Sequence, residues 1–491
     1  MKFLTLLLLF IFSNESISQI NKSFFLNENS LTNSKSINFL ETKGLPSVPA
    51  RSFLLEADSK VDYDLKISKK WKRAKSKKQW FISNGQKCRC REEVISNRIE
   101  ATNFKAEDNV TYLGDYRGKY LYKVTVPLVK INGNTQEYLS ELKVTSKNFN
   151  FFKRENIQKN SSEKLVVVLP TEFLSKKSII SDYYSNKFDS ILFITNNLII
   201  ENRRELAKKL KSLYNELKMS QVLFVGTSSA IPTFYVDTKF DSVTPSDYPY
   251  FKFGGENDLI PDVIASRWSF SSEDQISGFI YKLKNKLKFR ENRALGVSSN
   301  EGANPSDEEY VQSILASVAN PKNQIHLNQD ETDSNSTSFL SYLNQGLDLF
   351  NYIGHGSGFS WPSFGKEVLV SELEGWEPNQ RNPIVIDVAC QNGKFNGRGY
   401  IGETMVSGHQ KYDYKNGAAA YIGGSVDISW DPPAIFAQGM AQAFKENQSI
   451  QVGKAMFEGF FHLLELHHDV EDFIDHLEWT HLQGDATASI R

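Results

Sequence analysis

Short apolar runs separated by amphipathic segments dominate the chain from about residue 160 onward. Many of the runs are continuous and rich in Val and Ile. Strands that helices cover on both faces have this pattern, because neither face meets water. The expected strands span residues 165–169, 191–195, 222–225, 262–266, 294–298, 349–353, 384–388 and 418–422, and helical patterns span 201–217 and 310–318. This alternation predicts an α/β domain with a mainly parallel sheet flanked by helices.

The region before this domain has a different pattern. Residues 19 to about 60 are rich in Ser and Asn and show little periodicity, whereas 119–126 and 138–144 alternate apolar and polar residues. Half-buried strands alternate in this way. A charged, polar stretch, FFKRENIQKNSSEK, then begins at Phe151 and is typical of an exposed linker. We therefore expect a β-rich N-terminal domain over residues 19–154 and the α/β domain over 155–491.

The first residues predict a signal peptide. Lys2 precedes an apolar run over residues 3–12, and the small residues Ser16 and Ser18 follow, which places a cleavage site near Ser18–Gln19. The run is shorter than the roughly 20 residues that span a bilayer. We therefore expect residues 1–18 to be removed on export, a secreted or periplasmic protein, and no stable membrane insertion.

Charge excludes one class of partner. The chain of 491 residues carries 57 basic and 58 acidic residues, for a formal net charge of -1. Such a balance provides no overall field that would attract nucleic acid or an anionic membrane surface. No nucleic-acid partner is expected.

The chain has three cysteines, Cys88, Cys90 and Cys390. An odd number in an exported protein leaves at least one thiol unpaired. Cys88 and Cys90 are separated only by Arg89, so they can form a disulfide in an oxidising compartment or contribute to a metal site. The metal interpretation is weak because no second pair of ligands accompanies them. Cys390 is therefore the thiol for which a chemical role is expected.

Two apolar strands run directly into polar residues that can carry catalysis. LFNYIGHGSGFSW, over 349–361, contains His355, and PIVIDVACQNGKF, over 383–395, contains Cys390. Ligands of an open α/β sheet lie beyond the carboxyl ends of its strands. If the two strands are neighbours, the two side chains can therefore face each other. Each residue alone has an ordinary structural interpretation; the pair in this context favours a site.

The chemistry of this pair is that of peptide hydrolysis. A free thiol has a pKa near 8.5, so a nearby imidazole is needed to stabilise the nucleophilic thiolate and to protonate the leaving amine. The glycines beside His355 allow close approach of a substrate backbone. The amides of Gly356 and Cys390 are candidates for an oxyanion hole.

At this point the sequence resembles a known group of enzymes. An apolar strand followed by His-Gly, and a second followed by Ala-Cys-x-x-Gly, is similar to the caspase-like cysteine peptidases. NYIGHGS with Trp361, and DVACQNGKF, resemble the gingipains within that group. The resemblance covers about residues 164–491 and includes the segments QVLFVGTSSAIP, SDYPYF, DVIASRWS, LGVSSNEG and WTHLQGDATASIR. It implies a caspase-like α/β fold, with His355 as general acid/base, Cys390 as nucleophile, and Glu301 as the carboxylate near the histidine.

The same resemblance implies cleavage after Arg or Lys. Gingipains use an acidic residue in the specificity pocket, and Asp307 matches that residue in its local context, although the loop before it is shorter here. An alternative for Asp307 is the N-cap of a helix. Trp430 matches a tryptophan of the pocket wall, and Ala434 stands where arginine-specific members have Met. Asp427 and Asp431 are further acids close to this segment.

The resemblance also implies a β-rich prodomain that keeps the enzyme latent, so a zymogen is expected. Lys153-Arg154 is the expected maturation site, with cleavage after Arg154; maturation of an Arg154→Ala variant at the same bond would refute this. No cofactor is expected for catalysis, while structural calcium with unassigned ligands is consistent with the family. Gingipains carry further immunoglobulin-like and sorting domains beyond the point that corresponds to Arg491, so cell-surface attachment is not implied.

Another run is rich in groups that bind metals: HLLELHHDVEDFIDH, from His462. It lacks the HExxH spacing of a zinc peptidase. We interpret it as a solvated helical face.

Three functions follow from these patterns. The first is an endopeptidase that hydrolyses proteins or peptides after basic residues. The second is a processing transpeptidase on the same scaffold, and the third is a binding protein that retains the fold without catalysis. The intact His355, Cys390 and flanking glycines favour the enzymes.

Overall fold

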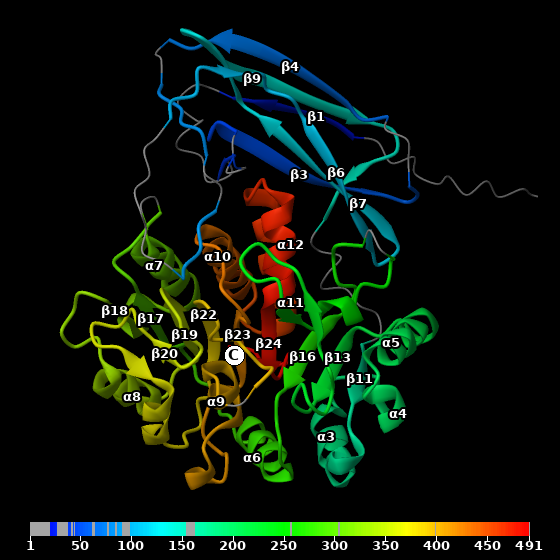
Figure 1. The fold of residues 1–491 in the computed structure, drawn as a ribbon, viewed down its shortest axis with the longest axis vertical. Helices are drawn as coiled ribbons and strands as arrows, with labels where there is room; N and C mark the ends of the chain where they lie inside the picture. Colours follow the sequence, from blue (N-terminus) through cyan, green and yellow to red (C-terminus); the bar gives the residue numbers. More distant parts are fainter. Residues whose placement is uncertain are drawn as a thin grey trace, which may run out of the picture.

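The computed structural model describes residues 20–26, 38–40, 43, 45–60, 64–75, 78–83, 86–90, 99–153, 163–255, 258–302, 305–397 and 399–490. The expected signal peptide and Arg154 lie outside these ranges, so removal of the one and cleavage after the other stay predictions. Figure 1 shows that the chain folds into two parts, a β-rich part at the top and a large α/β part below it.

The α/β part is built on a ten-stranded sheet with the order β12-β11-β13-β16-β24-β23-β22-β19-β17-β18. Every neighbouring pair is parallel except β23 and β24, which are antiparallel. The strands are β11 (Lys164–Val168), β12 (Ser190–Ile194), β13 (Gln221–Val225), β16 (Ile264–Trp268), β17 (Ala294–Ser298), β18 (Gln324–Asn328), β19 (Leu349–Ile353), β22 (Ile384–Val388), β23 (Ala420–Gly424) and β24 (Thr480–Gly484). The predicted mainly parallel sheet is confirmed, and each of the eight expected strands overlaps an observed one.

Helices cover both faces of this sheet because successive side chains of a strand point in opposite directions. Ile384 and Ile386 belong to the apolar cluster that includes α7, α10, α11 and α12. Val385, between them, belongs to the opposite cluster, with α3, α6, α8 and α9. The helices are α3 (Lys177–Tyr184), α4 (Asn197–Ile200), α5 (Arg203–Leu217), α6 (Glu273–Lys284), α7 (Asp307–Val318), α8 (Ser336–Gln345), α9 (Ile401–Ser407), α10 (Asp431–Glu446), α11 (Val452–Leu466) and α12 (Val470–Trp479).

Smaller elements complete this part. Two antiparallel pairs join β14 (Phe234–Val236) to β15 (Thr244–Ser246) and β20 (Ser360–Trp361) to β21 (Val368–Leu369). Short 3-10 helices span Thr171–Lys176, Tyr248–Tyr250, Pro321–Asn323, Val370–Gly375 and Gln410–Tyr412. Among the described residues, none of the helices combines the length and the apolar character that crossing a membrane requires.

The N-terminal part contains two five-stranded antiparallel sheets. One has the order β1-β9-β8-β5 with β4 also paired to β9, and the other has β10-β3-β7-β6 with β2 paired to β3. Their strands are β1 (Ile20–Phe25), β2 (Asn38–Phe39), β3 (Pro49–Ala57), β4 (Lys66–Arg73), β5 (Asn103–Phe104), β6 (Asn109–Tyr116), β7 (Lys119–Pro127), β8 (Val129–Asn132), β9 (Thr135–Ser146) and β10 (Asn150–Phe151). The expectation of a β-rich region is confirmed. It begins earlier than the sequence pattern indicated, because β1 and β3 lie within residues 19–60.

The two parts share an apolar core. Tyr116 of the N-terminal part packs its ring against Phe457 and Phe461 of α11, with ring centroids 6.2 and 5.5 Å apart. Phe152 lies 4.8 Å from Phe461 in the same cluster. Such burial is favourable at roughly 25 cal/mol per Å² of apolar surface removed from water. The N-terminal part therefore packs against α11, and it lies over α11 and α12 in Figure 1.

This docking corrects one interpretation of the sequence. The run from His462 was expected to form a solvated face, yet His467, His468 and His476 are buried. Ser52 of β3 hydrogen bonds His468 Nδ1 at 2.8 Å, and the amine of Lys123 donates to the carbonyl oxygen of His467. The N-terminal part contacts His467 and His468, whereas His476 packs against the rings of Phe436, Phe460 and Trp479.

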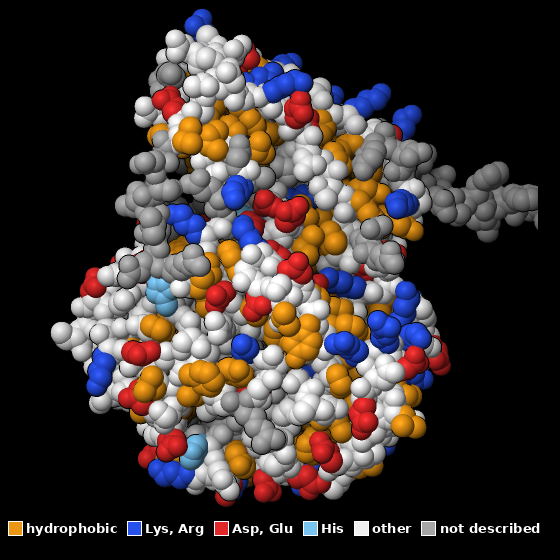
Figure 2. Space-filling view, in the orientation of Figure 1, with side chains coloured by type: hydrophobic (Ala, Val, Ile, Leu, Met, Phe, Trp, Pro, Cys, Tyr) orange, Lys and Arg blue, Asp and Glu red, His pale blue; other side chains and the backbone are white. Residues whose placement is uncertain are grey.

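The surface agrees with the balanced composition. Figure 2 shows acidic and basic side chains interspersed over the face in view. This face therefore carries charges of both signs, in keeping with the net charge of -1 of the whole chain.

Candidate active site

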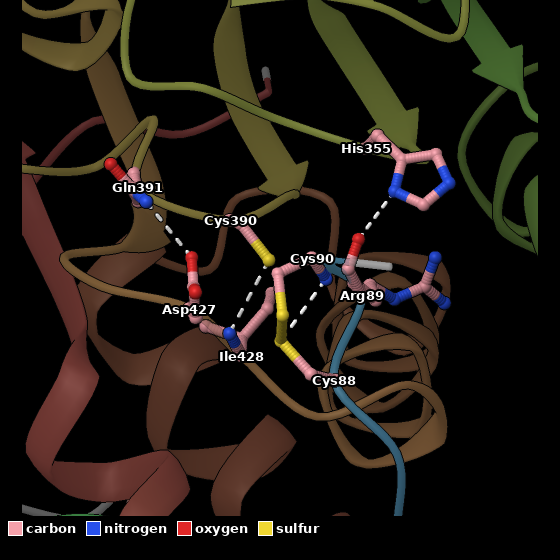
Figure 3. Close-up of a disulfide and its surroundings, with 8 residues drawn as sticks. All are labelled: Cys88, Arg89, Cys90, His355, Cys390, Gln391, Asp427 and Ile428. Atoms are coloured by element: carbon pink, nitrogen blue, oxygen red, sulfur yellow. Dashed lines mark hydrogen bonds between the residues drawn. A yellow bond between two sulfur atoms is a disulfide. The ribbon is translucent and has the colours of Figure 1, made fainter. Parts of the chain in front are cut away.

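The two strands that end at the candidate catalytic residues are neighbours. β19 and β22 pair in parallel, with Ile353 opposite Val388, so both chains leave the sheet at the same edge. His355 follows two residues after β19, and Cys390 follows two residues after β22. The structure therefore brings the two expected residues to one place, on either side of the same short segment of the N-terminal part (Figure 3).

The glycine after His355 is needed for this approach. A Cβ atom on Gly356 would lie 2.3 Å from the carbonyl oxygen of Cys390, which no side chain can tolerate. Gln391 has a φ of 62°, so the chain turns sharply immediately after the cysteine. These features place the backbones of Gly356 and Cys390, the two expected oxyanion donors, against each other.

His355 lies between two acceptors. Its Nε2 is 3.0 Å from Glu301 Oε1, and its Nδ1 contacts the carbonyl oxygen of Arg89. Neither partner can donate a proton unless the carboxyl is itself protonated, so the imidazolium, which has two N–H groups, is the form that satisfies both contacts. Glu301 comes from the loop after β17, as the resemblance implied, and it lies where it can stabilise that charge.

Cys390 is fully buried in this arrangement. Its sulfur accepts a hydrogen bond from the Ile428 amide at 3.5 Å. Burial is the main cause that raises the pKa of the Cys390 thiol to about 12; the Ile428 amide and Arg89 act to lower this pKa, and Asp427 acts to raise it. The thiol is therefore protonated at neutral pH, and the nucleophilic thiolate is not populated in this state.

The side chain of Arg89 is fully buried beside this pair, in a pocket formed by its contacts with Asp307 and Trp430. The guanidinium makes a bidentate ion pair with Asp307, with nitrogen–oxygen distances of 2.8 and 2.9 Å, and both side chains are fully buried. Asp307 Oδ2 also accepts from Ser299 at 2.7 Å. A fork of two parallel hydrogen bonds is the geometry in which a carboxylate best recognises arginine.

Trp430 forms the wall of this pocket. Its indole ring lies 4.6 Å from the centre of the Arg89 guanidinium, and its carbonyl oxygen accepts from Arg89 Nε at 2.8 Å. Stacking of a cation on an aromatic face adds to the ion pair. Ala434, the position at which arginine-specific members have Met, is fully buried.

The acids near the pocket have separate roles. The N-cap of α7 is Ser306, whose hydroxyl accepts from the Glu309 amide, so the alternative that Asp307 caps the helix is wrong. Asp431 is half-buried near Arg89 and has an electrostatic interaction with it. Asp427 instead accepts from the side chain of Gln391 at 2.9 Å.

The backbone around Arg89 lies along the site like a peptide strand. The Arg89 amide donates to the carbonyl oxygen of Ile428 at 2.9 Å, and Cys88 forms an antiparallel bridge with Ser429. Cys88 and Cys90 are joined in a disulfide. Addition of a strand to an exposed edge is a common way to bind an extended peptide. Arg89 was not among the residues predicted from the sequence.

A metal centre has little support in the part of the chain that the structure describes. The group of potential ligands found close together is Cys88, Cys90 and Asp427. Its two sulfurs are bonded to each other, so they are not available as thiolate ligands. Structural calcium stays an expectation.

Comparison with known proteins identifies relatives of the α/β part. A model of peptidase family C25 matches residues 158–491. Gingipain R2 of Porphyromonas gingivalis is 24% identical over 300 residues, which cover 56% of this chain and 38% of that protein. Gingipain R1 of the same organism is 24% identical over 300 residues, covering 56% and 28%. The chain thus spans less than two fifths of the length of these relatives.

Solved structures agree on the fold. The crystal structure of the Arg-specific cysteine proteinase gingipain R has a TM-score of 0.58 at 20% identity, over 68% of this chain and 79% of that chain. The complex of the pro- and mature domains of RgpB from Porphyromonas gingivalis has a TM-score of 0.59 at 20% identity, over 67% and 80%. The caspase-like fold expected from the sequence is confirmed. Because the family model spans the sheet together with His355 and Cys390, the chain belongs to peptidase family C25, as a gingipain-like cysteine peptidase.

Proposed function

We propose that this protein is an exported endopeptidase that cleaves after arginine and is made as a latent zymogen. The single observation that carries the proposal is the placement of Arg89, whose guanidinium pairs with Asp307 while its backbone hydrogen bonds the 428–430 segment. A substrate arginine before the cleaved bond can make the same contacts. Lysine has one ammonium group and cannot form the two parallel hydrogen bonds, so arginine is the preferred residue.

The reaction follows from the groups around this position. The Cys390 thiolate attacks the carbonyl carbon of the substrate arginine, and the developing oxyanion accepts hydrogen bonds from the Gly356 and Cys390 amides. The His355 imidazolium donates a proton to the leaving amine. Glu301 keeps the imidazole oriented and stabilises its charge. Water then hydrolyses the thioester; attack by an amine instead would make the enzyme a transpeptidase, which an amine-acceptor assay separates.

Latency is part of the proposal because Arg89 belongs to the same chain. While Arg89 fills the pocket and Cys390 stays protonated, no substrate arginine can bind. The shared core around Phe461 holds the N-terminal part in place. Removal of this part, for which Arg154 stays the predicted site, would open the pocket.

A cleavage profile of the matured protein tests the proposal. We expect a peptide library to be cut after arginine, more weakly after lysine, and the Cys390→Ala variant to show no cleavage above background. The profile is read by mass spectrometry of the fragments. Cleavage with no preference for a basic residue, or full activity of Cys390→Ala, would contradict the proposed function.

Glu301→Gln tests the role of the carboxylate near the histidine. The change keeps a hydrogen-bond acceptor but removes the charge that stabilises the imidazolium. A hydrogen bond to a charged group contributes about 1.5–3 kcal/mol, so kcat should fall by about 10- to 100-fold while KM changes little. Steady-state kinetics measure the split. Equal losses in Glu308→Gln, a nearby acid on α7, would show that the effect is not specific.

A further inference from the structure

The Cys88–Cys90 disulfide closes a small ring around Arg89. Only one residue separates the two cysteines, so both peptide bonds of Arg89 lie inside the ring. One of them, between Arg89 and Cys90, is the bond that a peptidase specific for arginine would attack. The ring therefore encloses the bond that the proposed activity would cleave.

The ring sits directly in the active site. Figure 3 shows the side chain of Cys390 pointing toward the segment from Cys88 to Cys90, with His355 on the other side of Arg89. The Arg89 carbonyl oxygen contacts His355, and its guanidinium is paired in the pocket. This segment is thus bound as a substrate would be, with its arginine paired to Asp307. It differs from the proposed substrate in the disulfide and in its carbonyl oxygen, which contacts His355.

The ring changes the outcome of an attack by Cys390. Formation of a bond between Cys390 Sγ and the Arg89 carbonyl carbon breaks the bond to the Cys90 nitrogen. In an open chain the new amine diffuses away, but here it stays attached to Cys88 through the disulfide. Well-positioned intramolecular groups react with effective molarities of about 10⁵–10⁸ M, so the tethered amine reforms the peptide bond faster than water hydrolyses the thioester.

We infer that the Cys88–Cys90 disulfide is a redox-modification site that acts as the latch of the zymogen, and that its natural co-reactant is a dithiol reductant. The inference rests on the proposed function. With the disulfide intact, Arg89 is a bound inhibitor. With the disulfide reduced, the same segment is a linear substrate that the enzyme cuts after Arg89.

The chemistry balances with one dithiol. Cys90 is exposed and Cys88 is half-buried, so one thiolate of the reductant attacks Cys90 Sγ and displaces the Cys88 thiolate. The second thiolate of the reductant resolves the mixed disulfide and releases Cys90. The reductant becomes a disulfide, and two electrons and two protons pass to the cysteines. Cys390 then attacks Arg89, the amine of Cys90 leaves with a proton from His355, and water hydrolyses the thioester.

The full-length precursor, purified without reductant, provides the test. Alkylation after denaturation should label one cysteine, and three after dithiothreitol treatment. We then follow cleavage after Arg89 by intact mass, and hydrolysis of a fluorogenic arginyl peptide, with and without dithiothreitol. In the wild type, the reductant should accelerate both by at least about tenfold, because the amine is no longer tethered. The Cys88→Ser/Cys90→Ser precursor should match the reduced wild type under both conditions.

The double variant also controls for oxidation of Cys390, since it retains that thiol. Equal stimulation of both proteins by dithiothreitol, equal rates without it, or three free thiols in the untreated precursor would overturn the latch. In those cases arginyl cleavage persists and the proposed function stands. Absence of arginyl cleavage in every sample would instead overturn the proposed function, and the latch with it.

Discussion

Replacing Asp307 with Asn is expected to lower kcat/KM for arginyl peptides by about 10²- to 10³-fold, because breaking a buried, bidentate ion pair costs about 3–5 kcal/mol. Both partners of the Arg89–Asp307 pair are fully buried, so water does not replace the lost contact. The remaining activity should no longer distinguish arginine from a neutral residue of similar length, such as citrulline. Steady-state kinetics on matched peptides of the matured enzyme give both quantities.

Glu308→Gln is the matched control for this change. Glu308 is the next residue of α7 and its side chain hydrogen bonds Gln312 on the surface of the helix. Its replacement should leave kcat/KM within about twofold, as surface changes usually do. Asp307 also accepts from Ser299, so melting temperatures of both variants must be compared with that of the wild type. An Asp307→Asn enzyme that is folded and keeps its arginine preference would show that another acid, such as Asp431, selects the substrate.

Replacing Arg89 with Ala in the precursor should expose Cys390 and increase its alkylation rate by about 10²- to 10³-fold. The substitution leaves the buried Asp307 without its cationic partner and removes the contact with the Trp430 ring, so the segment should leave the pocket. In the wild type, burial holds the pKa of the thiol at about 12, and alkylation should stay slow at neutral pH. Iodoacetamide labelling of the full-length species, followed by intact mass, measures the rate.

Two variants calibrate this result. Arg89→Lys keeps the charge but loses the bidentate geometry, and its alkylation rate should lie between those of the wild type and Arg89→Ala. Lys87→Ala changes a neighbouring basic residue and should react like the wild type. If Arg89→Ala and the wild type are alkylated at the same slow rate, the segment is held by other contacts, and Arg89 is not the inhibitory residue.

The sequence predicted the buried strands that consist mainly of apolar residues. β19 and β22 are continuous apolar runs, and the residues that follow them include His355 and Cys390, so the pattern alone locates the pair. β24 was not expected because its residues, THLQG, are mostly polar although all are buried. These polar residues can be buried between β16 and β23 because the sheet satisfies the hydrogen bonds of their backbone. Side chains find partners as well: the Gln483 amide donates to the carbonyl oxygen of Gly393.

The contact of Arg89 with the site could not be predicted in the same way. It joins residues more than 200 positions apart, and no periodic or motif signal marks an arginine between two cysteines as the occupant of a pocket. The prediction for the histidines near α12 was wrong for a related reason. Their polar composition is typical of a solvated face, but the docked N-terminal part contacts His467 and His468, and the rings of Phe436 and Phe460 pack against His476. Local sequence patterns do not report contacts between residues that are far apart in the chain.

Labelling with a peptidyl-arginyl chloromethyl ketone tests the central claim most directly. The reagent should alkylate the matured enzyme once, at Cys390, and peptide mapping by mass spectrometry should locate the adduct there. Asp307→Asn should be labelled at least about 10²-fold more slowly, since the arginine of the reagent needs the same ion pair. An adduct on a residue remote from Cys390, or arginyl cleavage that persists in a protein fully labelled elsewhere, would contradict the account.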